Sequence, residues 1–314
     1  MQKKYKLWII IIIAELIVLI AVLAGISRTR SHSKALPFEI PQDQRTAYGS
    51  DDLTAITDNA YWTFVHQRFI LVYDDEGVLQ WVKIDNQFGR NDYNFDSTLV
   101  EQEGFQYYTE NGEITSSVGI DVSKFQGTID WAQVKAAGVD FAFVRVGYRG
   151  YGNGAIKLDE TFDTNVAGAL KNDLNVGVYF YSQATTYEEG VEEAQFVLDN
   201  VKAYNINLPI VLDTEDPMDD TARTSGLTRE QRSEACRGFL ETIKAAGYTP
   251  MIYASRNMFA QCLDMDRLGD YELWLAHYAN VPNFPYKYTG WQYTESGSVD
   301  GIYGDVDLNL WFKD

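Results

Sequence analysis

Two carboxylates separated by a single residue stand at the end of an apolar segment in the second half of the chain. Residues 208–217 read LPIVLDTEDP, and the β-branched first half is typical of a strand that is buried on both faces. Because side chains at i and i+2 of a strand share a face, Asp213 and Glu215 are expected to project together, about 6.5–7 Å apart along the chain. Close carboxylates raise each other's pKa, which is one way to keep an acid protonated near neutral pH. The alternative is that the two residues cap the next helix or are solvated in a loop.

Further acidic residues and several aromatic residues also stand at the ends of predicted strands. Asp121 ends the segment 118–122, and Asp305 and Asp307 flank the segment 306–310, with Asp305 expected in a solvated turn. Aromatic side chains at such positions either stack on sugar rings or pack in the wall of a barrel. The candidates for sugar binding are Tyr148, Tyr179, Tyr181, Trp274, Tyr278 and Trp291. Carboxylates and aromatic rings without metal or phosphate ligands indicate glycoside hydrolysis.

The remaining composition argues against several other kinds of chemistry. The three histidines, His32, His66 and His277, are far apart, and the two cysteines, Cys236 and Cys262, form no CxxC pair, so no metal site is predicted. The cysteines form either a disulfide or two buried thiols. The net charge of −19 argues against nucleic acid as a partner, because binding it requires basic patches. We expect no metal and no cofactor.

From residue 118 onward, predicted strands and helices alternate. Strands are predicted at 118–122, 141–146, 176–181, 208–215, 250–253, 273–276, 290–293 and 306–310, and helices at 129–138, 160–172, 187–203, 228–246 and 256–263. Five βα units followed by three strands predict an α/β fold, an irregular TIM-like barrel over residues 116–314 whose last third lacks full helices. Such barrels place their chemistry at the carboxyl ends of the strands, so the acidic and aromatic residues are expected on one rim.

The N-terminal segment predicts a membrane anchor. Residues 7–26 are apolar except for Glu15 and are long enough to cross a bilayer as a transmembrane helix. Three lysines within residues 1–6 argue that this end stays in the cytoplasm, which places the rest of the chain outside the cell membrane. The small residues Ala21, Ala24 and Gly25 leave cleavage open, in which case the protein is secreted. Residues 27–58 are polar and are interpreted as a linker.

A small β-rich extension is predicted at residues 59–115. The aromatic and β-branched segments 61–65, 69–73 and 79–84 are interpreted as strands, with a hairpin turn at 74–77. The extension either binds wall polymer or packs against the barrel. The sequence does not indicate the oligomeric state.

Residues 118–311 resemble glycoside hydrolase family 25, the lysozymes of the Chalaropsis type. The resemblance lies in GIDVSKFQGTIDW at 119–131, VGVYFYS at 176–182, PIVLDTED at 209–216, LWLAHY at 273–278 and WQYTESGSVDGIYGDVDLN at 291–309. It implies hydrolysis of the β-1,4 bond between N-acetylmuramic acid and N-acetylglucosamine, with peptidoglycan glycan strands as partner, for cell-wall remodelling. FYSQATT at 180–186 departs from an aromatic-His-Phe-like run in many relatives, which puts the substrate contacts of that segment in doubt.

Carried over by position, the resemblance implies a role for each carboxylate. The general acid is Glu215, its companion is Asp213, the first-strand aspartate is Asp121, and the aspartate of the VDxN segment is Asp307. Asp213 is expected to stabilise positive charge at the reaction centre, either by holding the substrate's acetamide as an internal nucleophile or as a direct nucleophile. Two other hypotheses stay open, a tethered peptidoglycan-binding module without activity and a glycosidase for another N-acetylated polysaccharide such as chitin.

Overall fold

The computed structural model describes residues 68–73, 79–84, 88–95, 97–217 and 219–312. Phe69–Asp314 form one compact unit. The predicted membrane segment at 7–26, the linker at 27–58, the strand expected at 61–65 and the turn expected at 74–77 lie outside the described residues. Within the described residues, no helix combines the length and the apolar character needed to cross a membrane.

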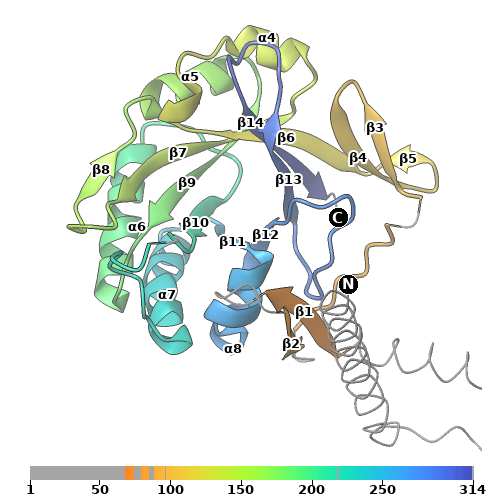
Figure 1. Ribbon diagram of the computed structural model, residues 1–314. Coiled ribbons are helices and arrows are strands. Elements are labelled where there is room, and N and C mark those ends of the chain that lie inside the picture. Colours follow the sequence, from red (N-terminus) through yellow and green to blue (C-terminus); the bar gives the residue numbers. More distant parts are fainter. Residues whose placement is uncertain (1–67, 74–78, 85–87, 96, 218, 313–314) are drawn as a thin grey trace, which may run out of the picture. The chain divides into compact units, whose positions relative to one another are not determined.

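An eight-stranded barrel forms the centre of this unit (Figure 1). Its strands are β6 (Ser116–Val122), β7 (Phe141–Arg149), β9 (Asn175–Ser182), β10 (Ile210–Thr214), β11 (Pro250–Ser255), β12 (Glu272–Ala276), β13 (Gly290–Gly297) and β14 (Val306–Phe312). Pairing of β6 with β7 closes the sheet, and β8 (Ile156–Leu158) pairs only with the end of β7. Neighbouring strands are parallel, except that β14 runs antiparallel to β13 and to β6. The predicted barrel of five βα units and three further strands is confirmed.

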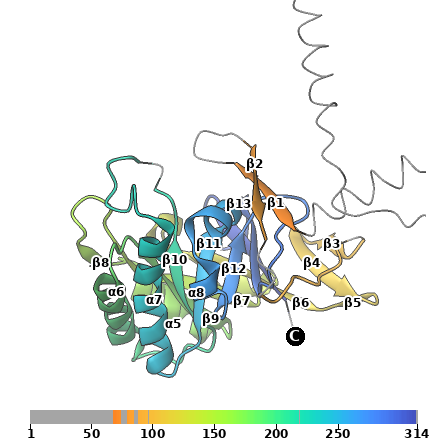
Figure 2. The same cartoon turned by 90° about the horizontal axis from the view of Figure 1, so that it is seen from below.

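Helices cover the outside of the first five strands, as Figures 1 and 2 show. They are α4 (Trp131–Ala136), α5 (Phe162–Lys171), α6 (Tyr187–Val201), α7 (Arg229–Ala245), a π-helical turn (Met258–Cys262) and α8 (Met265–Leu268). Helices α6 and α7 approach closely because Gly190 and Gly238 have no side chain, and a Cβ on either would lie about 2 Å from a backbone carbonyl oxygen of the other helix. Cys236 on α7 and Cys262 are free thiols, so the disulfide alternative is wrong.

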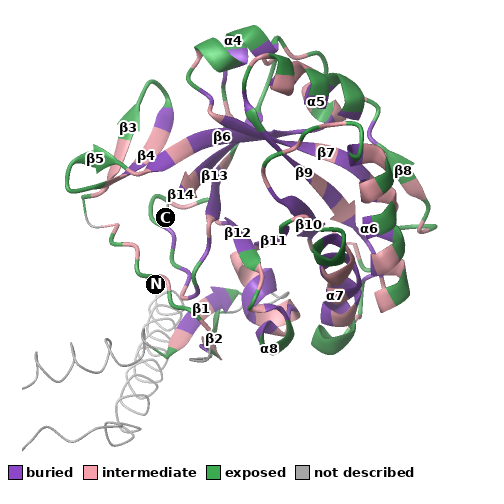
Figure 3. Ribbon diagram, turned by 180° about the vertical axis from the view of Figure 1, so that it is seen from behind, coloured by how far each residue is buried: buried purple, intermediate pink, exposed green. Residues whose placement is uncertain are grey.

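Strand alternation separates the barrel interior from the layer under the helices. On β10, Ile210 and Leu212 belong to the outer core, whereas Val211 packs inside with Phe143 and Trp274. Figure 3 shows these strands as largely buried. Because side chains alternate, Asp213 follows Val211 to the interior, at the carboxyl end of the strand.

The described part of the extension covers the strands that lack helices. It consists of the hairpin β1 (Phe69–Tyr73) with β2 (Leu79–Lys83) and the sheet β3 (Leu99–Gln102), β4 (Phe105–Glu110) and β5 (Glu113–Ile114). Tyr93 stacks on Phe312 of β14 with ring centroids 4.1 Å apart, and Tyr108 meets the same ring edge-on. These contacts favour packing against the barrel over a free wall-binding module. The strands β3–β5 were not predicted.

Candidate active site

A cavity of about 290 Å³ opens at the carboxyl ends of the parallel strands. It brings together the four predicted carboxylates, Asp121, Asp213, Glu215 and Asp307. The other lining residues are Ser123, Phe125, Gln126, Arg145, Tyr179, Tyr181, Tyr253, Trp274, Tyr278, Gln292 and Glu295. Its volume is at the lower limit for a ligand pocket, so a polymer bound here extends beyond it.

The reversed direction of β14 explains how Asp307 reaches the same rim as Asp121. Asp307 lies near the start of its strand, but in the antiparallel register it stands directly opposite Asp121 at the end of β6. Asp305, two residues earlier in the chain, is exposed and lines no part of this cavity, so the expected solvent exposure is confirmed, although the residue lies in an irregular segment and not in a turn.

Two amide side chains hold the buried carboxylate of Asp121. Gln292 Nε2 donates to Asp121 Oδ2 at 2.9 Å, and Asn309 Nδ2 donates to the same oxygen at 2.8 Å. The amides are themselves oriented, because Trp274 Nε1 donates to Asn309 Oδ1 and the hydroxyls of Tyr253 and Tyr278 both donate to Gln292 Oε1. A buried network with these donors satisfied holds Asp121 in one position.

Asp213 and Glu215 are in hydrogen-bond contact and both have a raised pKa. Burial is the first cause for each group, and the charge of Glu215 raises the pKa of Asp213 further. The charges of Asp121 and Glu295 add to the rise for Glu215, against the hydrogen bond with Asp213. Two carboxyl groups in contact do not both ionise readily, so loss of the second proton from the pair is shifted to higher pH.

Asp307 is a second carboxyl group that stays protonated at neutral pH. Burial raises its pKa to about 9, together with the charge of Asp121 and the hydrogen bond to it. The hydrogen bonds from Asn309, Gln292 and Asp307 oppose the rise that burial causes in the pKa of Asp121. Neutral Asp307 thus donates to Asp121, which acts as the acceptor.

The structure brings four of the six predicted sugar-binding aromatics to the cavity. Tyr179, Tyr181, Trp274 and Tyr278 line it. Tyr148 is half-buried and does not line it; its ring lies near Lys124 and Arg145 instead. The prediction for Trp291 is wrong, because this side chain has no exposed surface, faces outward and meets Phe95 of the extension.

Several cavity residues were not predicted from the sequence. Gln292, Tyr253, Glu295 and Arg145 line the cavity, as does Phe125, whose ring is 76% exposed. The pairing of β13 with β14 shifts in register between Gln292 and Thr294, so that Gln292 and Glu295 both reach the cavity despite their odd spacing. Regular alternation would have placed these two side chains on opposite faces. Gln292 and Tyr253 lie in the predicted strand segments at the rim, and this position was the one feature of the sequence that could have identified them as cavity residues.

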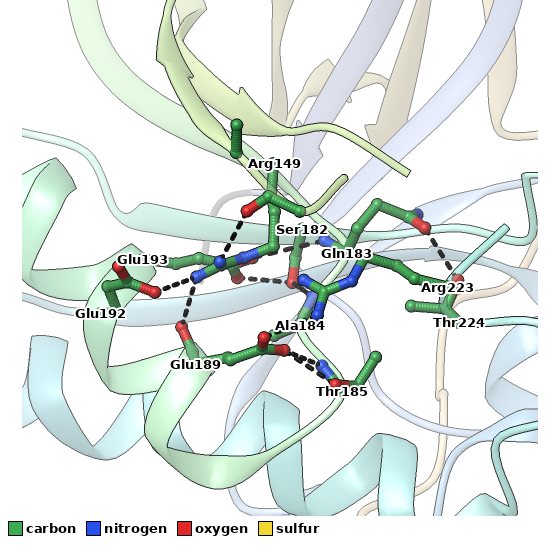
Figure 4. Close-up of polar contacts among 12 residues, drawn as sticks. Arg149, Ser182, Gln183, Ala184, Thr185, Glu189, Glu192, Glu193, Arg223 and Thr224 are labelled. Atoms are coloured by element: carbon green, nitrogen blue, oxygen red, sulfur yellow. Dashed lines mark hydrogen bonds and ion pairs between the residues drawn. The ribbon is translucent and has the colours of Figure 1, made fainter. Parts of the chain in front are cut away.

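A buried polar network supports the strand ends beside the cavity (Figure 4). Arg149 Nε donates to Glu193 Oε1 at 2.7 Å, and Glu193 also accepts from Ser182 Oγ at 2.6 Å. Gln183 accepts from Thr224 Oγ1 at 2.8 Å, which joins the end of β9 to the loop after β10. The segment FYSQATT, which departs from the family pattern, therefore uses its Ser and Gln for structure, while Tyr181 faces the cavity.

Removing the cation from this network is expected to destabilise the fold. Glu193 is fully buried, and burial raises its pKa to about 7 despite its hydrogen bonds from Ser182 and Arg149. Arg149→Ala leaves this carboxylate without its cation, which lowers the free energy of unfolding by about 3–5 kcal/mol. Chemical denaturation measures the change. Arg267→Ala, at an exposed ion pair, is the control and is expected to leave the free energy of unfolding nearly unchanged. Equal losses in the two variants would contradict the prediction.

Within the described residues, no group of three or more His, Cys, Asp or Glu side chains has the arrangement of a metal site. The carboxylates of the cavity instead contact one another or amide donors. The arrangement therefore supports proton transfer and stabilisation of positive charge by the chain's own groups.

Comparisons with known proteins identify the family of the chain. The sequence model for glycosyl hydrolases family 25 matches residues 120–302. The autolytic lysozyme of Clostridium acetobutylicum is 28% identical over 192 residues, 61% of this chain and 54% of that protein. Lysozyme M1 of Streptomyces globisporus is 31% identical over 207 residues, 62% of this chain and 68% of that protein.

Solved structures give the same result. The modular autolysin LytC from Streptococcus pneumoniae, in complex with a synthetic peptidoglycan ligand, aligns with a TM-score of 0.57 and 27% identity. The alignment covers 78% of this chain and 56% of LytC. The chain thus spans about half the length of LytC and of the clostridial lysozyme.

Proposed function

The chain belongs to glycosyl hydrolase family 25, and we propose that it hydrolyses the β-1,4 bond between N-acetylmuramic acid and N-acetylglucosamine in peptidoglycan. The observation that carries this proposal is the hydrogen-bonded pair of Asp213 and Glu215 in a cavity that also contains Asp121 and Asp307. Relatives that are lysozymes and a related autolysin with a peptidoglycan ligand support the choice of substrate.

Glu215 acts as the general acid in this proposal. Burial raises its pKa and so favours the protonated form, which donates its proton to the leaving glycosidic oxygen. Glu215 is only half-buried and lines the open cavity, whereas Asp213 lies deeper, at the end of β10. The more accessible member of the pair is thus the one that meets the leaving group.

Asp213 stabilises the positive charge that develops on the sugar ring. Its Oδ1 is buried and has no hydrogen-bond partner among the described residues, so it is ready to accept an N–H from the substrate. This favours the route in which Asp213 holds the acetamide as an internal nucleophile. A direct attack by Asp213 is the alternative.

The test is mass spectrometry of the soluble fragments released from purified peptidoglycan by the full chain in mild detergent. The proposal predicts muropeptides with reducing N-acetylmuramic acid ends. Reducing N-acetylglucosamine ends would show that the protein is a glycosidase that cleaves the other glycosidic bond of the strand. Wall binding without any fragments would favour the non-catalytic binding module, and faster cleavage of chitin oligomers would favour the chitin-type substrate.

A membrane tether is a separate part of the proposal. Residues 7–26 are apolar over the length of a bilayer and follow three lysines, which supports an anchor with the barrel outside the cell, acting on the wall. Cell fractionation tests it: the full chain is expected with the membrane, and a variant without residues 7–26 is expected in the soluble fraction. A shortened chain in the medium would indicate cleavage and secretion instead.

A further inference from the structure

A second cavity lies next to the first, and neither Asp121 nor Asp307 lines it. Its volume is about 500 Å³, and it shares Glu215, Tyr253, Tyr278 and Glu295 with the first cavity. The remaining lining residues are Asp216, Ser255, Arg256, Asn257, Ala276 and His277. A polymer that passes Glu215 therefore occupies both cavities.

Arg256 is the one arginine or lysine among the residues that line this second cavity. In the part of the chain that the structure describes, no carboxylate lies within ion-pair distance of Arg256, and no hydrogen bond ties its guanidinium to the protein. The other cavity arginine, Arg145, differs, because it pairs with Asp159 at 2.6 Å. Burial lowers the pKa of Arg256, but an arginine side chain remains charged at any physiological pH. A half-buried guanidinium at a cavity wall, without a partner in the described part of the chain, has its hydrogen-bond donors available to an anion.

Two neighbouring side chains add hydrogen-bond donors. Burial and the charge of Arg256 lower the pKa of His277 to about 4, so the imidazole is neutral near pH 7. Its Nδ1 accepts the backbone N–H of Asn283 at 3.2 Å, which assigns the ring proton to Nε2. Ser255 Oγ accepts the backbone N–H of Met258 at 3.2 Å and keeps its own proton to donate. The cavity thus combines a guanidinium, an N–H and an O–H.

We propose that the Arg256 cavity binds a carboxylate carried by the glycan strand, which rests on the proposed peptidoglycan substrate. The planar guanidinium takes a carboxylate in two parallel hydrogen bonds, with His277 and Ser255 as further donors. Asp216 and Glu295 disfavour an anion elsewhere in the cavity, so Arg256 is the group that attracts it. Muramic acid offers such a group in two forms, the free lactyl carboxylate of a peptide-free strand and the carboxylates of the attached peptide.

The test compares the full-length wild type with Arg256→Gln, Arg256→Lys and the surface control Arg267→Gln. Four substrates are used: peptide-free strands, peptide-bearing strands, and both after conversion of their carboxylates to amides. We expect Arg256→Gln to raise KM and to lower kcat/KM about 10- to 100-fold on a carboxylate-bearing substrate, and less than about twofold on its amidated form. Arg256→Lys keeps the charge without the planar fork and recovers part of the loss. Arg267→Gln stays near the wild type on all four.

The pattern of losses identifies the carboxylate. A loss on peptide-free strands assigns the lactyl group, and a loss confined to peptide-bearing strands assigns the peptide. Equal losses on amidated and unmodified substrates would overturn the proposal, because the arginine would then act through structure alone. Higher salt is also expected to weaken wild-type binding of the unmodified strands more than binding by Arg256→Gln.

A binding measurement separates this proposal from the proposed activity. Soluble strands are titrated into Glu215→Gln and into Glu215→Gln/Arg256→Gln, neither of which needs to turn over. The second variant is expected to bind the carboxylate-bearing strands about 10- to 100-fold more weakly and the amidated strands equally well. If the wild type cleaves no strands and the two variants still differ in affinity, the proposed activity is contradicted and the proposed carboxylate site is supported. Equal affinities of the two variants for the unmodified strands would overturn the site.

Discussion

Glu215→Gln is expected to lower kcat/KM on peptidoglycan by at least about 100-fold, with little change in substrate binding. The glutamine has nearly the same shape, but its amide does not donate a proton to the leaving oxygen, and general acid catalysis contributes about 10²- to 10⁴-fold. The reducing ends released per minute measure turnover, and titration of soluble strands measures affinity.

Asp305→Asn is the matched control for this variant. Asp305 precedes Asp307 by two residues, but it is exposed and lines neither of the two cavities, so its loss of activity should stay below about twofold. Normal turnover by Glu215→Gln would contradict the role of Glu215 as the general acid. An equal loss in both variants would show that the effect is one of overall charge.

The barrel and its acidic rim were predictable because strand alternation and strand ends are local properties of the sequence. The β-branched run before Asp213 predicts a buried strand, and the same alternation sends Val211 and Asp213 to the interior. Asp121 follows from the same argument on the first strand. Asp307 was predicted from its resemblance to a family motif, and only the antiparallel pairing of β14 shows why a residue near the start of a strand reaches the rim.

The errors and omissions depend on contacts between distant segments. Trp291 is buried because Phe95 of the extension covers it, and nothing near Trp291 in the sequence indicates this cover. Glu295 reaches the cavity only because the register of β13 shifts after Gln292. Arg256 is a candidate binding residue because no carboxylate of the described chain lies within ion-pair distance of it. A single sequence contains no local signal for any of these three.

The second large effect is expected for Asp213→Asn, which should lower kcat/KM about 100-fold and move the alkaline limb of the pH profile to lower pH. Losing the second proton from the pair of Asp213 and Glu215 places two charges in contact, which shifts this ionisation to higher pH. In the variant, Glu215 ionises without this repulsion, and the new amide can donate to the ionised form. Both effects lower the pKa of Glu215, so the active protonated acid is lost at lower pH.

The profile of kcat/KM between pH 4 and pH 9 measures this shift, because it reports the ionisation of the free enzyme. An alkaline limb that stays in place, or moves to higher pH, would contradict a proton shared by the pair. Asp305→Asn is again the control, with a limb at the wild-type position.

Stability against pH provides a test of the same pair that does not need activity. The folded-state pKa of Asp213 is raised, so between the unfolded pKa of about 3.9 and the folded value the folded protein binds more protons than the unfolded chain. The contribution of this group to stability therefore falls as pH rises through that window, and Asp213→Asn lacks the fall. Its melting temperature should match the wild type near pH 4 and exceed it near pH 8, where about 1 kcal/mol corresponds to about 2–4 °C. A variant that is more stable than the wild type at neutral pH and yet nearly inactive would show that Asp213 serves catalysis and lowers the stability of the folded protein.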